Sequence, residues 1–170
     1  MLRKLACRVI ASIVAFLCGC GASEVVNPPV QTVPPAETRI GEISSITFKS
    51  HGCPDESLKC TVFEVTFRSN GTATYIGKAN DEYMGTSVAK FPQRDFAALA
   101  DEVRHQRFFE MPRVMESTYV DETIVLEVVS SEGTHTVTTY NWAQTPVELR
   151  KLLAVVHYQI LEVPFELVKE

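Results

Sequence analysis

The chain has 170 residues, with 16 lysines and arginines against 21 aspartates and glutamates, so its formal charge is −5. An acidic balance argues against nucleic-acid binding, which depends on a basic surface. Hydrophobic residues make up 45% of the chain and charged residues 22%, which excludes a disordered protein and fits one globular domain with an appendage.

The N-terminal segment has the features of an export signal. Arg3, Lys4 and Arg8 form a basic region, and residues 9–23 are uncharged and mostly apolar. A membrane-spanning helix needs about 20 apolar residues, so this stretch is too short to span a bilayer. Its length and basic flank predict a secretory signal peptide over residues 1–19.

The end of the apolar run predicts a site of lipid attachment. Residues 17–20 read Leu-Cys-Gly-Cys, which resembles the lipobox that precedes the acylated cysteine of bacterial lipoproteins. Acyl chains on Cys20 would anchor the protein, since two or more chains hold a protein stably at a membrane. Gly21, in place of aspartate, favours the outer membrane of the cell envelope. The alternatives are a plain signal peptide cleaved near Ala22 and a short buried N-terminal helix.

Residues 20–41 are predicted to be the lipidated cysteine and a tether. They contain Asn-Pro-Pro at 27–29 and Val-Pro-Pro at 33–35, with polar residues between and no apolar periodicity. Proline lacks a backbone donor and fixes its own φ angle, so this composition favours an extended linker. We expect the tether to lift the domain off the membrane; an arm packed on the domain is the alternative.

The folded domain is predicted over residues 42–170, and its first half begins with a strand near residues 43–48. The run 61–68 alternates apolar and polar residues and predicts a strand that places on one face Phe63, Val65 and Phe67. Asn70-Gly71 then favours a hairpin turn, because this dipeptide tolerates positive φ angles. Pro92 opens a helix to about residue 107, with an apolar stripe of Phe96, Leu99, Ala100 and Val103.

The second half repeats this order. Residues 124–128 alternate as a strand, Glu132-Gly133 makes a turn, and residues 134–140 return. Thr145-Pro-Val-Glu148 is a capping box for a second helix, whose apolar stripe is Leu149, Leu152, Leu153, Val156 and Ile160. The pattern predicts an α+β fold: an antiparallel sheet built from two hairpin-then-helix units, with both helices packed on one face. The repetition is either an internal duplication or two segments that obey the same pattern rules.

Several motifs recur together in a known family. The first half has the paired Cys53 and Cys60, the Asn70-Gly71 turn and a Tyr-x-Gly return at Tyr75-Ile76-Gly77. The second half has Phe108-Phe109, Tyr119, Asp121 and a Pro-x-x-Leu helix at Pro146 to Leu149. Over about residues 43–162 the chain thereby resembles bacterial domain of unknown function 6438, whose members are commonly secreted or lipid-anchored. Thr61 departs from the family's usual proline. The resemblance implies no activity.

Cys53 and Cys60 bracket a polar loop and are the predicted disulfide. Disulfides form in the oxidising compartments that follow export. Closing this loop would contribute about 2.5 kcal/mol on a chain-entropy estimate. The alternative is a redox or metal site that also uses His51, although the cysteine spacing fits neither a Cys-x-x-Cys motif nor a common zinc site.

Two clusters before and after the second hairpin are candidate sites. Asp121 and Glu122, preceded by Tyr119, are either an acid pair in a cleft or a turn whose aspartate accepts backbone hydrogen bonds. Tyr140 and Trp142 are either a ligand platform or a plug at the sheet edge. We name as candidate binding residues Tyr119, Asp121, Tyr140 and Trp142.

The sequence predicts a lipid-anchored envelope protein with a non-catalytic binding or structural domain. We expect a membrane partner through Cys20, a protein or cell-wall component as ligand, and neither nucleic acid, metal nor cofactor. No serine-hydrolase elbow, phosphate loop or dinucleotide fingerprint occurs, so an enzyme is the less favoured class. Two alternatives stay open: a periplasmic hydrolase that uses Asp121 or Glu122, and an inhibitor of a secreted enzyme that uses the loop between Cys53 and Cys60.

Overall fold

The computed structural model describes residues 41–53, 55, 59–118 and 120–168, which all belong to the unit Thr38–Glu170. The predicted signal peptide, the lipidated Cys20 and all of the predicted tether except Gly41 fall on residues 1–40 and lie outside the described residues, as does Tyr119.

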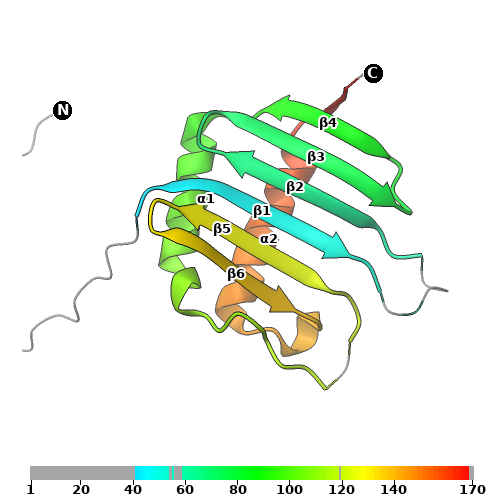
Figure 1. Cartoon of the computed structure of the whole chain (residues 1–170), viewed down its shortest axis with the longest axis vertical. Coiled ribbons are helices and arrows are strands. Elements are labelled where there is room, and N and C mark those ends of the chain that lie inside the picture. The colour runs from blue at the N-terminus through cyan, green and yellow to red at the C-terminus, as the bar shows by residue number, and fades with distance from the viewer. Residues whose placement is uncertain (1–40, 54, 56–58, 119, 169–170) are drawn as a thin grey trace, which may run out of the picture. The chain divides into compact units, whose positions relative to one another are not determined.

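Seven strands form one antiparallel sheet. In chain order they are β1 (Ile43–His51), β2 (Val62–Arg68), β3 (Thr72–Ala79), β4 (Gly85–Lys90), β5 (Ile124–Ser130), β6 (Gly133–Thr139) and β7 (Glu166–Leu167). The order across the sheet is β6-β5-β1-β2-β3-β4-β7, so the first strand of the domain lies between the hairpins β2–β3 and β5–β6 (Figure 1).

Two α-helices lie on one face of this sheet, α1 (Gln93–His105) and α2 (Val147–Glu162). The described residues also form two short 3₁₀ turns, η2 (Phe108–Glu110) and η3 (Trp142–Gln144). Figure 1 shows α1 behind the end of the sheet that holds the β2–β3 and β5–β6 turns, and α2 behind the middle. The domain is therefore α+β, as the sequence predicts. We call the end covered by α1 the closed end, and the opposite end, where β1 finishes at His51, the open end.

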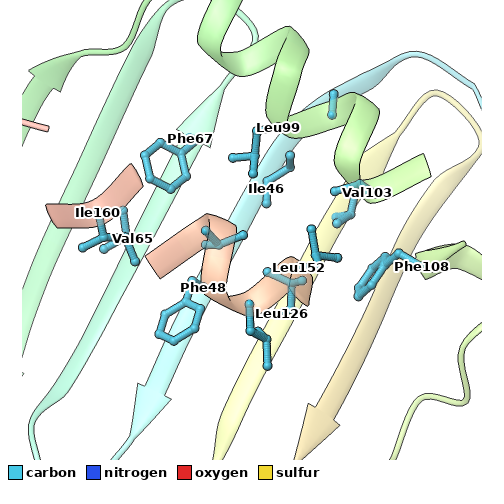
Figure 2. Packing of buried hydrophobic residues seen from close by; sticks show 14 of the residues in the cluster. Ile46, Phe48, Val65, Phe67, Leu99, Val103, Phe108, Leu126, Leu152 and Ile160 are labelled. Atoms are coloured by element: carbon cyan, nitrogen blue, oxygen red, sulfur yellow. The ribbon is translucent and has the colours of Figure 1, made fainter. Parts of the chain in front are cut away.

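The core confirms the predicted apolar faces. The buried residues of α1 are Phe96, Leu99, Ala100 and Val103, and those of α2 are Leu149, Leu152, Leu153, Val156 and Ile160. They meet the inward residues of the strands, among them Ile46, Phe48, Val65, Phe67 and Leu126 (Figure 2). Because successive strand residues point to opposite faces, this alternation puts apolar side chains under the helices and polar ones on the other face.

Strand β4 was not predicted. It lies between the hairpin β2–β3 and helix α1, whereas no strand separates the hairpin β5–β6 from helix α2. Its sequence, Gly-Thr-Ser-Val-Ala-Lys, has one large apolar side chain, Val88, and that side chain is exposed. A strand this polar gives no alternation signal, and its pairing with β3 holds it in place.

The capping box predicted for the second helix is wrong. Pro146 is the N-cap of α2 and no side chain caps this end. The Thr145 hydroxyl instead donates to the Asn141 carbonyl oxygen at 2.7 Å and lies 2.6 Å from the Thr139 hydroxyl. These partners are buried, so the threonine ties η3 to strand β6 rather than to the helix.

Candidate functional site

A row of aromatic rings crosses three strands toward the open end of the sheet. Phe48 of β1 stacks on Phe63 of β2, with ring centroids 5.7 Å apart, and Phe63 stacks on Tyr75 of β3 at 5.4 Å. Phe48 and Tyr75 belong to the core under the helices. Phe63 lies diagonally across from both in the strand register, so all three rings are on the helix side of the sheet. Phe165 and His157 contact the two ends of the row, at Tyr75 and Phe48. We call Phe48, Phe63 and Tyr75 the aromatic floor.

Two neighbouring clefts open above this floor. The larger, about 700 Å³, lies over Phe63 and Tyr75 between the loop 80–83 and the residues that end α2. The smaller, about 480 Å³, lies over Phe48 and Phe63 beside Trp142. The two clefts share Phe63, His157 and Leu161, so they form one elongated groove along α2. This is the size and apolar character expected of a ligand site.

The rim of the groove exposes large apolar side chains. Tyr83, Trp142, Tyr158 and Leu161 are between 47% and 71% accessible to solvent, and each lines one of the clefts or both. Clustered exposed apolar residues mark interaction sites more often than scattered ones do. Tyrosine and tryptophan are also the residues that contribute most to binding at interfaces.

Strand β3 positions the loop 80–83, which forms one wall of the larger cleft and which we call the wall loop. The Tyr75 hydroxyl donates to Asp81 Oδ2, and the Tyr83 backbone N–H donates to Asp81 Oδ1 at 2.9 Å. Burial, followed by the hydrogen bond to Asp81, raises the pKa of Tyr75, so its hydroxyl stays a donor. Gly77 permits this fold, because a side chain there would overlap the carbonyl group of Tyr83.

The disulfide prediction is confirmed. Cys53 and Cys60 are bonded, with their Cα atoms 5.6 Å apart. The Asn80 side chain donates to the Cys60 carbonyl oxygen at 3.2 Å, so the disulfide loop and the wall loop are joined at the open end. In the part of the chain that the structure describes, no group of three or more histidine, cysteine or acidic side chains could hold a metal.

The predicted acid pair separates in the structure. The Asp121 side chain is exposed, and its backbone N–H donates to the Tyr140 carbonyl oxygen at 2.9 Å. Glu122 is half-buried, accepts a hydrogen bond from the Ser50 hydroxyl at 2.7 Å and lines the smaller cleft. Only Glu122 of the pair therefore faces the groove.

The aromatic cluster also divides. The Asn141 side chain caps η3 by accepting from the backbone of Ala143 and Gln144, which turns Trp142 out to the rim of the smaller cleft. Tyr140 is half-buried and lines neither of the two clefts. Of the three candidate binding residues that the structure describes, Asp121, Tyr140 and Trp142, only Trp142 lines the groove.

Most residues that line the groove were not predicted from the sequence. Tyr158 and Leu161 lie on α2 outside its apolar stripe, and this is the signal that could have found them. An exposed tyrosine or leucine beside a complete stripe has no core to fill. Tyr83 and Phe165 come from loops that fold back over the sheet, and no periodic pattern brings them together.

A comparison with family models matches residues 44–160 to a domain of unknown function (DUF6438). The chain belongs to this family. The matched range contains the aromatic floor and the wall loop. The Tyr-x-Gly motif of this chain positions that loop, because Tyr75 donates a hydrogen bond to Asp81 and Gly77 leaves room for Tyr83. The residues after Ile160 that close the larger cleft lie beyond the matched range.

No curated protein matches the chain. Within the described ranges, no helix has the length and apolar character needed to cross a membrane.

Proposed function

We propose that this chain is a lipid-anchored protein of the outer membrane of a bacterial cell envelope, whose DUF6438 domain binds a protein or a cell-wall component without catalysis. The observation that carries the proposal is the groove along α2, with its stacked aromatic floor and its exposed Trp142, Tyr158 and Leu161. A solvated apolar surface of this kind lowers its free energy when a partner covers it.

The groove and the start of the domain lie at opposite ends of β1, which supports a binding role for the anchored domain. The described residues begin at Gly41, just before the closed end of β1, and a side chain at Gly41 would meet Ser131 of the β5–β6 turn. The groove lies toward the open end, beyond Phe48. A tether that enters the domain at Gly41 would join it at the closed end, and the groove is at the opposite end of β1.

The anchor is tested by the intact mass of the protein extracted from membranes. A mass that starts at Cys20 and includes acyl chains is the expected result, together with a Cys20→Ser variant that loses the acyl mass. A mass that starts near Ala22 without acyl chains would contradict the proposal. The disulfide between Cys53 and Cys60 fits the oxidising compartment that export implies.

The binding role is tested with the full chain in mild detergent. Purified sacculi and solubilised envelope proteins are each incubated with the wild type, with Trp142→Ala and with Leu161→Ser. Retention by one of these fractions that both substitutions weaken is the expected result. Val114→Ser is the matched control, because Val114 is an equally exposed apolar residue beside β6, away from the groove. Retention that all variants share equally would contradict a role for the groove.

A second candidate function, hydrolysis by Asp121 or Glu122, is supported by the position of Glu122 in the smaller cleft. A carboxylate at the edge of a cleft can act as a general base. This proposal requires that Glu122→Gln abolish turnover of cell-wall fragments while leaving their binding intact. An unchanged rate of turnover in Glu122→Gln would exclude it.

We also propose that the domain derives from two hairpin-then-helix units. In support, each hairpin places its first strand antiparallel to β1, so that Phe48 of β1 pairs with Val65 of β2 on one side and with Leu126 of β5 on the other. The test is sequence similarity between the halves across family members, measured against shuffled halves. Similarity no greater than that of the shuffled halves would contradict duplication.

A further inference from the structure

We infer that the groove binds a segment of polypeptide that carries basic side chains next to apolar ones. This inference rests on the binding function proposed above and adds the chemical class of the partner. It follows from the charges around the groove, from the apolar rim and from the elongated shape.

The charged residues in the two cleft linings, apart from His157, are all acidic: Asp81, Glu82 and Glu122. Among the residues that the structure describes, none of these three takes part in an ion pair. Two lysines lie close to the linings along the chain: Lys78, which is paired with Glu64, and Lys59, which is exposed and precedes Thr61 by two residues. The groove therefore has an uncompensated negative charge, which favours a cationic partner.

The end of α2 adds to this negative potential. Its last turn carries no basic residue, and Glu162 is the last residue of the helix. The carbonyl groups at a helix C-terminus act as a partial negative charge, which lysine or arginine commonly offsets. Here Val163, Pro164 and Phe165 continue from this end into the wall of the larger cleft. A basic side chain of a partner would supply the missing cation.

The rim determines what else the partner must carry. Tyr83 and Tyr158 present exposed aromatic rings, and Trp142 does so at the far end of the smaller cleft. Such rings bind apolar side chains and also attract ammonium and guanidinium groups through their faces. A polar polycation would leave these rings in water, so the partner must have apolar residues as well.

The shape favours a chain over a compact molecule. The clefts of about 700 and 480 Å³ lie on either side of the shared residues Phe63, His157 and Leu161. An extended segment can place one apolar side chain in each cleft and pass over the shared residues between them. Acidic residues occur in both linings, Asp81 and Glu82 in one and Glu122 in the other, so basic residues would find partners at both ends.

The test uses the full chain and fluorescein-labelled synthetic peptides, with fluorescence anisotropy as the measurement. The probe is Lys-Trp-Lys-Leu-Lys-Trp. The comparison ligands are Glu-Trp-Glu-Leu-Glu-Trp, Lys-Ser-Lys-Ser-Lys-Ser and a tetramer of N-acetylglucosamine. We expect saturable binding of the probe alone, which weakens as salt is raised.

Two substitutions locate the site. Glu82→Lys should weaken probe binding about 10-fold, because it replaces attraction by repulsion at the larger cleft. Leu161→Ser should weaken it about 5-fold through lost apolar contact. Glu132→Lys is the matched control: it makes the same charge change at an exposed position in the β5–β6 turn at the closed end, and it should bind like the wild type.

The outcomes separate this inference from the proposed function. Equal weakening by Glu82→Lys and Glu132→Lys would overturn it, since binding would then follow net charge alone. Preferential binding of the acidic peptide, the serine peptide or the sugar would also overturn it. If envelope material is retained through Trp142 and Leu161 but the probe does not bind or compete, the binding function stands and the inference fails. If neither binds, both fail.

Discussion

Phe63 and Phe67 lie four residues apart on the same face of β2, yet they have different surroundings. Phe67, at the closed end, is fully buried and packs against Phe91 with ring centroids 4.5 Å apart. Phe63, toward the open end, is half-buried and stacks in the floor of the groove. Both positions follow the same alternating pattern, and the helices decide which becomes core.

The apolar face of the sheet extends farther than the area that the two helices cover. Figure 1 shows α1 behind the closed end and α2 behind the middle. Phe67 and Leu99 of α1 lie in the same core (Figure 2). Beyond α2, the wall loop and the residues after Ile160 surround the remaining rings without filling the space above them. The apolar pattern of a strand thus continues into a binding surface.

Truncating Phe67 and Phe63 should give the largest difference in stability between the closed and the open end. Phe67→Ala should lower the free energy of unfolding by about 3–5 kcal/mol, because it leaves a cavity in a packed core. Phe63→Ala should lower it by about 1–2 kcal/mol, since part of that ring already contacts water. Denaturant unfolding measures both. Equal losses would contradict the distinction between the closed and open ends.

Removal of the disulfide tests how the open end is held. The double substitution Cys53→Ser and Cys60→Ser should lower the free energy of unfolding by about 2.5 kcal/mol, the chain-entropy value for so short a loop. Hydrogen exchange should rise around Asn80, which is bonded to the loop, and not around Phe91 at the closed end. Reductant should destabilise the wild type and leave the double variant unchanged.

Gly77→Ala tests how the wall loop at the open end is held in place. The added methyl group would overlap the carbonyl of Tyr83, so the loop must move, at a cost of roughly 1–3 kcal/mol. The Tyr83 amide should lose protection against hydrogen exchange, because its bond to Asp81 depends on the loop position. Lys78→Ala, on the adjacent residue, is the control and should leave the Tyr83 amide protected.

The smallest effect is expected at the closed end and depends on pH. His135 packs edge-on against Phe108, and burial lowers its pKa from 6.5, with Arg113 adding to the shift. The unfolded chain therefore binds a proton first, and stability is lost as pH falls through 6.5 toward the lower folded pKa. Unfolding at a series of pH values should show this slope in the wild type and less of it in His135→Gln. An identical slope in both would contradict the assignment.

The sequence predicted local features well. Both helix stripes and the inward face of β2 agree with the structure residue by residue, because a 3.6-residue or two-residue period reports one buried face. The disulfide also agrees, since the two cysteines border one loop. These features depend on neighbours in the chain and need no knowledge of topology.

The groove and the sheet order depend on contacts between distant residues, and the sequence did not reveal them. Trp142 was a candidate, but its neighbours Phe63 and Tyr158 come from β2 and α2. The Thr145 capping box failed because Asn141 and Thr139 compete for the same hydroxyl. Strand β4 was missed because its side chains are mostly exposed, so its pairing, not its composition, defines it.

The position of β1 inside the sheet has a consequence for how the chain folds. This strand is the first in the domain, yet its second neighbour, β5, follows only after β4 and α1. Pairing such as that of Phe48 with Leu126 must close a long loop, which slows folding. Until β5 arrives, one side of β1 presents unpaired backbone groups, and an exposed strand edge invites aggregation. A chain that emerges from its N-terminus would therefore expose this edge of β1 throughout the interval between its fourth and fifth strands.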